Sequence, residues 1–242
     1  MKATRIASAI TAAAALVCGS AHAQKAGDWQ VGAGWLGFYP QDSSEPLTFT
    51  APQPAVVPGS GSSVSNANTL GINATYFIDS NWGVEGVVGI PPKFKLYGSG
   101  TLSPLGEIGD ARQWSPTVLA KYYFGDGNAT LRPYVGLGAT YIWFSDVNLS
   151  SSLQNGLASQ IGAPVALSGT TGKIDSKFAP VFNVGVAYQF DQHWGMAFSV
   201  SYIPLKTTAH LTTTVAGLPV AASQATIKLN PIIPYLALTY KF

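Results

Sequence analysis

The chain has 242 residues and only 10% of them are charged, whereas soluble proteins average about 25%. Two of the 13 basic residues fall within the first 23 positions, so the remaining 11 balance the 11 acidic residues, and nothing favours a nucleic-acid partner. After residue 23 no apolar run approaches about 18 residues, which excludes transmembrane helices.

Residues 1–23 have the composition of a secretory signal peptide. Lys2 and Arg5 provide a positive start, residues 6–17 form a short apolar run, and Ala21-His22-Ala23 matches a cleavage site. The only cysteine, Cys18, lies in this segment, so the mature chain is predicted to have no disulfide and no cysteine metal site. We therefore expect a signal peptide at 1–23 and a single domain at 24–242.

From residue 29 onward the chain repeatedly alternates between apolar and small or polar side chains. The clearest case is the segment 131–144, LRPYVGLGATYIWF. Successive side chains of a strand point to opposite faces. One face of this strand therefore carries an apolar row that consists of Leu131, Pro133, Val135, Leu137, Ala139, Tyr141 and Trp143.

Seven further segments repeat this alternation, and none of the eight apolar rows contains a charged residue. The other segments are 29–39, 70–78, 82–90, 114–124, 182–190, 194–202 and 232–242. A lysine or arginine that faces lipid at mid-depth costs about 2–4 kcal/mol, so rows without charge suit strands whose outer face meets hydrocarbon. We predict an all-β fold, an eight-stranded antiparallel transmembrane β-barrel in the outer membrane of a Gram-negative bacterium.

The connections between these segments alternate in length. They are short at 79–81, 125–130 and 191–193, and long at 41–68, 97–112, 146–177 and 206–226. Outer-membrane barrels have short periplasmic turns and longer external loops. The segment 41–68 contains several prolines and a GSGSS run, so it is predicted to have no regular structure.

Five stretches resemble the OmpW family of eight-stranded outer-membrane barrels. They are GDWQVGAG from Gly27, LGINATYFIDSNWGVE from Leu70, SPTVLAKYYF from Ser115, RPYVGLGATYIWFSD from Arg132 and the closing LALTYKF. Together they cover most of the strands and little of the external loops. The resemblance implies uptake of small hydrophobic molecules through a tunnel that opens sideways into the membrane. Phe242, with apolar residues at alternate positions before it, also resembles the terminal motif that the barrel-assembly machinery recognises.

Inward positions near the short turns are predicted to form a polar plug at the periplasmic end. The candidate residues are Gln30, Glu85, Lys121, Arg132, Gln189 and Lys241. Charges inside a narrow barrel need partners, so we expect Glu85 to pair with one or more of Lys121, Arg132 and Lys241. The main role expected for the plug is structural, as a lock that fills the barrel, rather than a path for ions.

Inward positions near the external ends of the strands are apolar instead. The candidates for an upper-lumen ligand site are Leu36, Phe38, Ile142, Phe144, Ile203 and Leu205. A water-filled pore would carry polar side chains at this height, so this row favours a site for a hydrophobic ligand. The alternative is that these side chains pack against one another and leave no space.

Three prolines are candidates for a lateral opening. Pro91 and Pro92 lie in the upper part of one strand and Pro116 in the upper part of the next. Proline cannot donate to a strand ladder, so pairing between these neighbours should fail there. The alternative is that the prolines only mark strand ends above the bilayer. Lys93 and Lys95, just beyond, suit a rim that faces the phosphates of lipopolysaccharide.

Two other classes of function are alternatives to transport. A lipid-modifying enzyme would need a nucleophile and a base near the rim, and His210 has no acidic residue close to it in sequence to orient it. A structural or adhesive barrel with no transport role fits the low-complexity loops equally well. No cofactor and no metal site is predicted, and the expected partners are membrane lipid, lipopolysaccharide, small hydrophobic solutes and the assembly machinery.

Overall fold

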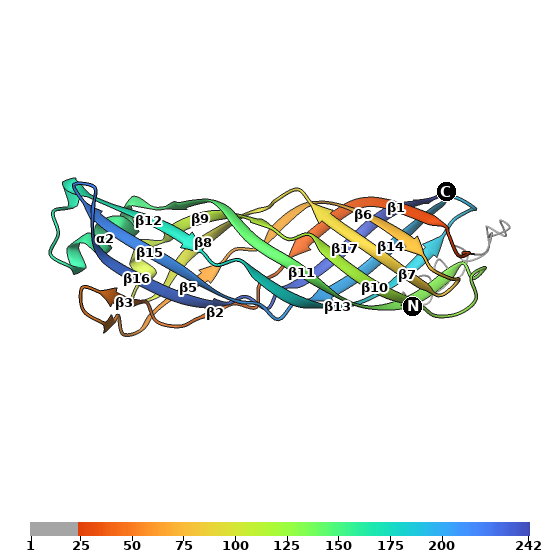
Figure 1. Ribbon diagram of the computed structural model, residues 1–242, viewed down its shortest axis with the longest axis horizontal. Helices are drawn as coiled ribbons and strands as arrows, with labels where there is room; N and C mark the ends of the chain where they lie inside the picture. The colour runs from red at the N-terminus through yellow and green to blue at the C-terminus, as the bar shows by residue number, and fades with distance from the viewer. Residues whose placement is uncertain (1–23) are drawn as a thin grey trace, which may run out of the picture.

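The computed structural model describes residues 24–242, so the signal peptide predicted at 1–23 and Cys18 lie outside the described residues. The strands form an elongated molecule with two parts (Figure 1). The C-terminus and the short turns lie at one end. The segments predicted as long loops lie at the other.

Eight antiparallel strands form the barrel. They are β1 (Trp29–Phe38), β6 (Ala67–Phe77), β7 (Trp82–Gly89), β10 (Thr117–Tyr123), β11 (Leu131–Leu149), β13 (Lys177–Gln189), β14 (Trp194–Tyr202) and β17 (Ile232–Lys241). Their order is β10-β7-β6-β1-β17-β14-β13-β11, and pairing of β10 with β11 closes the ring. The predicted eight-stranded antiparallel barrel is therefore confirmed.

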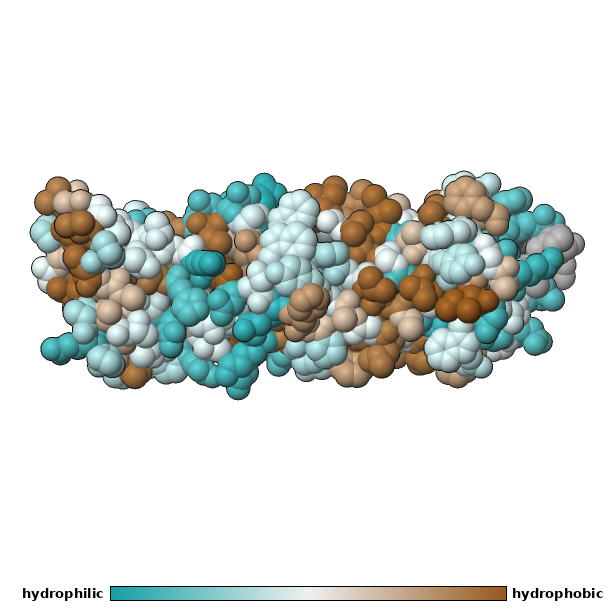
Figure 2. All heavy atoms as spheres, in the orientation of Figure 1, coloured by the Kyte–Doolittle hydropathy of each residue, from teal (hydrophilic) through white to brown (hydrophobic). Residues whose placement is uncertain are grey.

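The two faces of the barrel strands differ as the alternation predicted. Val135 of β11 pairs with Val184 of β13, and their side chains are 44% and 57% exposed on the outer face. Their neighbours Tyr134 and Asn183 point inward and are each 3% exposed. In Figure 2 brown side chains gather over the barrel strands, whereas teal side chains gather over the adjoining part of the molecule. The outside of the barrel is thus its apolar side.

Two of the short turns share one hydrogen-bond pattern. The carboxylate of Asp79 accepts the backbone N–H groups of Asn81 and Trp82, both at 2.7 Å. Asp191 accepts those of His193 and Trp194 at 2.8 and 2.7 Å. These backbone donors hold the pKa of each carboxyl below its ordinary value, because they stabilise the charged form.

The segments predicted as long loops contain regular structure, and the prediction of none for 41–68 is wrong. That segment holds β2 (Ser43–Ser44), β3 (Thr48–Ala51), β4 (Ala55–Val56) and β5 (Ser60–Val64). The others hold β8 (Lys93–Gly100), η1 (Ser103–Leu105), β9 (Glu107–Trp114), α2 (Ser151–Gln160), η2 (Val165–Leu167), β12 (Ser168–Ile174), β15 (Lys206–Val215) and β16 (Leu218–Lys228). Serine- and glycine-rich segments form strands here because neighbouring strands supply a ladder, and threonine favours a pleated surface.

These elements continue the barrel wall beyond its external end, and we call them the extension. One wall runs β11-β9-β8-β5, and a second sheet has the order β12-β15-β16-β3-β4. The extension has its own apolar core, to which α2 contributes Leu153 and Leu157. The hydroxyl of Ser150 caps α2 by accepting the N–H of Leu153. The extension is therefore a packed structure and not a set of loose loops.

Candidate functional site

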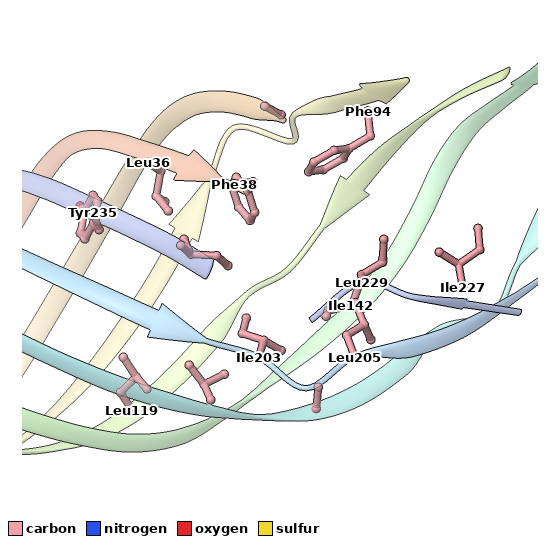
Figure 3. Close-up of a cluster of buried hydrophobic side chains, with 14 of the residues drawn as sticks. Leu36, Phe38, Phe94, Leu119, Ile142, Ile203, Leu205, Ile227, Leu229 and Tyr235 are labelled. Atoms are coloured by element: carbon pink, nitrogen blue, oxygen red, sulfur yellow. The ribbon is translucent and has the colours of Figure 1, made fainter. Parts of the chain in front are cut away.

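The six residues predicted to line the upper lumen lie in one apolar cluster where the barrel meets the extension. Leu36, Phe38, Ile142, Ile203 and Leu205 are all buried, and Phe144 packs against them. The cluster also contains residues that the sequence analysis did not select, among them Phe94, Ile227, Leu229 and Tyr235 (Figure 3). Alternation along β8, where Phe94 lies between Lys93 and Lys95, is the sequence feature that identifies Phe94 as inward.

One part of this cluster, which we call the apolar waist, consists of the buried side chains of Phe38, Phe94, Ile142, Leu205 and Leu229. The rings of Phe38 and Phe94 meet edge to face, with centroids 5.8 Å apart. Ile142 is fully buried and Leu205 is 2% exposed. At this level the side chains pack against one another, as the alternative interpretation expected.

Below the waist, the barrel encloses a cavity of about 650 Å³, part of it open to solvent, which we call the lumen cavity. Leu36, Phe38 and Ile203 line it, so half of the predicted ligand residues face free space. Polar side chains of Glu85, Asn183, Ser199 and Ser201 line it as well. The ligand role of the predicted residues stays a prediction, and it applies most directly to the three that line this cavity.

A second cavity, with about 690 Å³ of space that includes open solvent, lies on the other side of the waist and is called the external chamber. Its apolar lining includes Leu47, Ile108, Leu149, Leu153 and Leu211. Ile227 also lines it and belongs to the buried cluster around the waist. A largely apolar chamber and a cavity of mixed lining therefore lie on either side of the apolar waist.

The polar plug is built around one ion pair. Nζ of Lys121 lies 2.5 Å from Oε1 of Glu85, and both side chains are about 95% buried. Oε2 of Glu85 accepts hydrogen bonds from Asn73 and Thr75, each at 3.0 Å. The expected pairing of Glu85 therefore involves Lys121. The sequence analysis missed Asn73 and Thr75, although both are inward positions of β6 facing β7.

Arg132 belongs to a separate group nearer the short turns. Its guanidinium donates to the side chain of Gln24 and to the carbonyls of Ser80, Tyr123, Phe124 and Gly125. Arg132 and Lys241, both buried, line a small pocket at the periplasmic end together with the half-buried Gln189. Gln30 is buried as well, and the side chain of Gln189 donates to the carbonyl of Trp194.

Three aromatic rings, missed by the sequence analysis, lie between the ion pair and Arg132. Phe77, Tyr123 and Tyr134 are 0, 2 and 3% exposed and form one cluster. The ammonium of Lys121 lies 4.4 Å from the ring centre of Tyr134, and Arg132 lies 5.4 Å from that of Tyr123. Cations over ring faces are stabilised by the negative face of the ring. Ion pair, rings and arginine thus fill the lower barrel in three layers.

The three prolines lie where pairing between two neighbouring walls stops. The β7–β10 ladder ends at Val87 opposite Thr117, and the β8–β9 ladder begins at Lys93 opposite Arg112. The carbonyl of Pro92 accepts the N–H of Gln113, at 3.1 Å. Among the described residues, no backbone hydrogen bond joins 88–91 to 114–116.

At this break, the backbone at Pro116 bonds to β11 and not to residues 88–91, and both sides of the break border the lumen cavity. The carbonyl of Pro116 accepts bonds from the N–H of Tyr141 and the hydroxyl of Thr140, so it faces β11. The lining of the lumen cavity includes Gly89 and Pro92 on one side of the break and Ser115 on the other. The structure therefore brings Pro91, Pro92 and Pro116 to one place in the wall, next to free space. Their role as an opening stays a prediction.

The lysines predicted for the rim are engaged in ion pairs on the surface of the extension. Nζ of Lys93 lies 3.1 Å from Asp110, and Nζ of Lys95 lies 2.8 Å from Glu107. Both lysine side chains are about half exposed. The bond to Glu107 raises the pKa of Lys95, because it stabilises the ammonium form. The rim therefore carries both signs of charge.

His210 has an acidic neighbour in space, Asp175, that lies far from it in sequence. Its Nε2 lies 3.4 Å from Oδ1 of Asp175, with both side chains exposed on the extension. In the part of the chain that the structure describes, no three His, Cys, Asp or Glu residues are grouped so as to hold a metal ion. No helix within residues 24–242 is long and apolar enough to cross a membrane.

Comparison with known proteins places this geometry among outer-membrane barrels. A family model described as the OmpW family matches residues 25–242. Outer membrane protein W of Vibrio cholerae is 32% identical over 231 residues, which is 95% of each chain. The dibenzothiophene metabolism operon protein PahQ of Pseudomonas aeruginosa is 28% identical over 191 residues, or 77% of each chain. The crystal structure of OprG from Pseudomonas aeruginosa superposes with a TM-score of 0.77 at 27% identity, over 93% of this chain and 99% of that one.

Proposed function

The chain belongs to the OmpW family and is an outer-membrane barrel of a Gram-negative bacterium; from this premise we propose that it takes up small hydrophobic molecules and releases them sideways into the membrane. One relative is named for a dibenzothiophene metabolism operon, and dibenzothiophene is an apolar aromatic solute of the class proposed. The steps of the proposal are capture in the external chamber, passage through the waist, and exit from the lumen cavity.

Capture and passage are supported by the largely apolar lining of the external chamber and by the apolar part of the lumen cavity's lining. Moving an apolar solute from water into such a lining is favoured by about 25 cal/mol for each Å² removed from water. The waist between the two spaces is itself apolar, formed by side chains such as Phe38 and Leu205, so a solute meets no polar barrier there. Phe38 and Leu205 must move aside, because both are buried in packed contact.

Sideways exit is supported by what lies below and beside the lumen cavity. Below it, the Glu85–Lys121 pair and the three aromatic rings fill the barrel, so an apolar solute would have to displace a buried ion pair. Beside it, the wall lacks backbone hydrogen bonds between 88–91 and 114–116. The observation that carries the proposal is that the lumen cavity extends to this unpaired stretch of wall.

Two glycines of β7 provide a matched test. Gly89 lines the lumen cavity at the break, and a Cβ added there would lie 3.5 Å from Thr69 and 3.6 Å from Leu36, which are ordinary contacts. Gly86 lies on the outer face, and an added Cβ would meet nothing within 4 Å. We predict that Gly89→Leu reduces uptake of a solute such as naphthalene to near background, whereas Gly86→Leu leaves it unchanged.

The measurement is the initial rate of naphthalene uptake by cells that express each variant at equal levels of folded protein. Equal uptake in both variants, with the wild type well above a strain that lacks the protein, would place the exit elsewhere. Uptake by the wild type no greater than in that strain would contradict transport altogether and favour a structural or adhesive barrel.

The other partners belong to the same proposal. Phe242 is 71% exposed at the end of β17, where the assembly machinery would meet it during insertion. Lys93 and Lys95 would face lipopolysaccharide phosphates from the extension, with Asp110 and Glu107 beside them. Phosphates would compete with these carboxylates for the two ammonium groups.

A further inference from the structure

The lumen cavity contains one buried acceptor that has no donor. Asn183 of β13 is 3% exposed and belongs to the lining of this cavity. Its Nδ2 donates to Oγ of Ser201 at 2.8 Å, whereas its Oδ1 is buried without any hydrogen-bond partner. Buried polar atoms are normally paired, and Asn183 lines the cavity, so its unpaired oxygen indicates a partner that arrives from that space.

The other polar groups around the cavity do not supply this partner. Glu85 offers no donor, because its carboxylate is ionised and only accepts: Oε1 from Lys121, and Oε2 from Asn73 and Thr75. The described residues contain two other buried side-chain atoms without a partner, on Ser62 and Ser223, and neither residue lines the lumen cavity. Asn183 therefore marks a single point of the lining where a donor is missing.

The lining around this point is mixed. Ser199 and Ser201 of the neighbouring strand β14 line the cavity together with Asn183, and so do the apolar Leu36 and Ile203. The formal charges of Glu85 and Lys121 cancel within their ion pair. A charged ligand would therefore lie in the barrel without a counter-charge, which is costly.

We propose that the lumen cavity binds a neutral amphiphile with one hydrogen-bond donor, such as an aliphatic alcohol or a phenol. Its hydroxyl donates to Oδ1 of Asn183 and its apolar body lies against Leu36, Phe38 and Ile203. This inference rests on the proposed function, because it assumes that solutes reach the lumen cavity. An ether or a ketone of the same size has only acceptors and would leave Oδ1 unpaired.

The test compares two photoreactive probes on the full mature barrel in lipid nanodiscs. One probe is an aliphatic diazirine with a terminal hydroxyl, and the other is its methyl ether. Mass spectrometry measures labelling of lumen-facing residues in 177–202, normalised to labelling of the lipid-facing Val135 and Val184. We expect half-maximal labelling by the alcohol at a concentration about tenfold lower, which corresponds to about 1.4 kcal/mol, the size of one hydrogen bond.

Variants then assign this preference to one residue. Asn183→Leu should remove it and leave labelling by the ether unchanged, whereas Ser199→Ala, in the same lining, should retain it. Ser201→Ala frees the amide of Asn183 to turn its donor toward the cavity, so the ether should bind better and the preference should fall. If Asn183→Leu does not fold, as judged by heat-modifiable mobility on gels, Ser201→Ala decides the question.

Two outcomes separate this inference from the proposed function. Equal labelling of the lumen by both probes, or a preference unchanged in Asn183→Leu or in Ser201→Ala, would overturn the donor assignment while solute binding in the cavity stands. Labelling of lipid-facing residues alone, by both probes, would overturn the proposed function together with this inference.

Discussion

At the scale of single residues, the buried charges of Glu85, Lys121 and Arg132 inside the barrel all have polar partners. The Glu85–Lys121 pair was predictable from the sequence. Alternation along each strand points both side chains inward, and both residues lie at a similar distance from the short turns. The partners of Arg132 were not predictable, since four of them are backbone carbonyls in or beside the short turns. A carbonyl has no sequence signature, so only the path of the chain reveals such partners. The unpaired oxygen of Asn183 was beyond prediction for the same reason.

Removal of one partner of the Glu85–Lys121 pair should strongly lower the free energy of unfolding. Lys121→Met leaves the Glu85 carboxylate buried without its cation, and we expect a loss of about 3–5 kcal/mol in the free energy of unfolding. The double variant Lys121→Met/Glu85→Gln should recover much of this loss. Unfolding by urea in lipid vesicles, followed by tryptophan fluorescence, measures both.

The matched control for this experiment is Lys95→Met. Its ion pair with Glu107 lies on the surface, so its removal should change the unfolding free energy little. Similar losses for Lys95→Met and Lys121→Met would mean that the buried pair contributes no more than an exposed one, contrary to the layered plug described above.

At the scale of elements, prolines and ladders explain both a correct prediction and a wrong one. The missing N–H groups of Pro91, Pro92 and Pro116 predicted a break between neighbouring strands, and the ladders stop there. The strands of the extension were not predictable from composition, because a run such as GSGSS is typical of loops. Its strand β5 exists because β8 lies alongside it and pairs from Ser60 to Val64. Pairing of this kind is a tertiary effect that overrides local preference.

The prolines should control exit if the break is the opening. Pro91→Ala with Pro92→Ala restores two N–H groups at the break, one of which can face residues 114–116, so we expect a new ladder bond there and slower uptake of naphthalene. Pro180→Ala is the control, because this proline lies in β13 opposite Ala139, away from the break. Uptake that stays at the wild-type rate in the double variant would show that pairing at this edge does not limit exit.

At the scale of the whole molecule, one chain faces two solvents. The barrel and its direction were predictable, because eight uncharged rows and alternating connections require an apolar outer face and two unlike ends. The extension was not, so the sequence analysis placed the external boundary of ordered structure too close to the barrel. Exposed apolar residues occur in both parts, and exposure alone does not separate them: Leu137 of β11 is 58% exposed and Leu167 of η2 is 61% exposed.

These two leucines test where hydrocarbon ends. Leu137→Arg should lower the stability of the inserted barrel by about 2–4 kcal/mol, because its side chain faces lipid. Leu167→Arg should have little effect, since its surroundings are aqueous. The fraction of protein that inserts into vesicles, together with urea unfolding, measures the difference. Equal behaviour of the two variants would contradict the assignment of the barrel to lipid and the extension to water.

The packed apolar waist should also exclude water-soluble solutes from the barrel. Hydrated ions, sugars and hydrophilic antibiotics must shed water to pass a ring of hydrocarbon side chains, and below it they meet a filled lower barrel. If uptake proceeds as proposed, a bacterium can produce this protein in bulk without making its envelope leakier to water-soluble toxins.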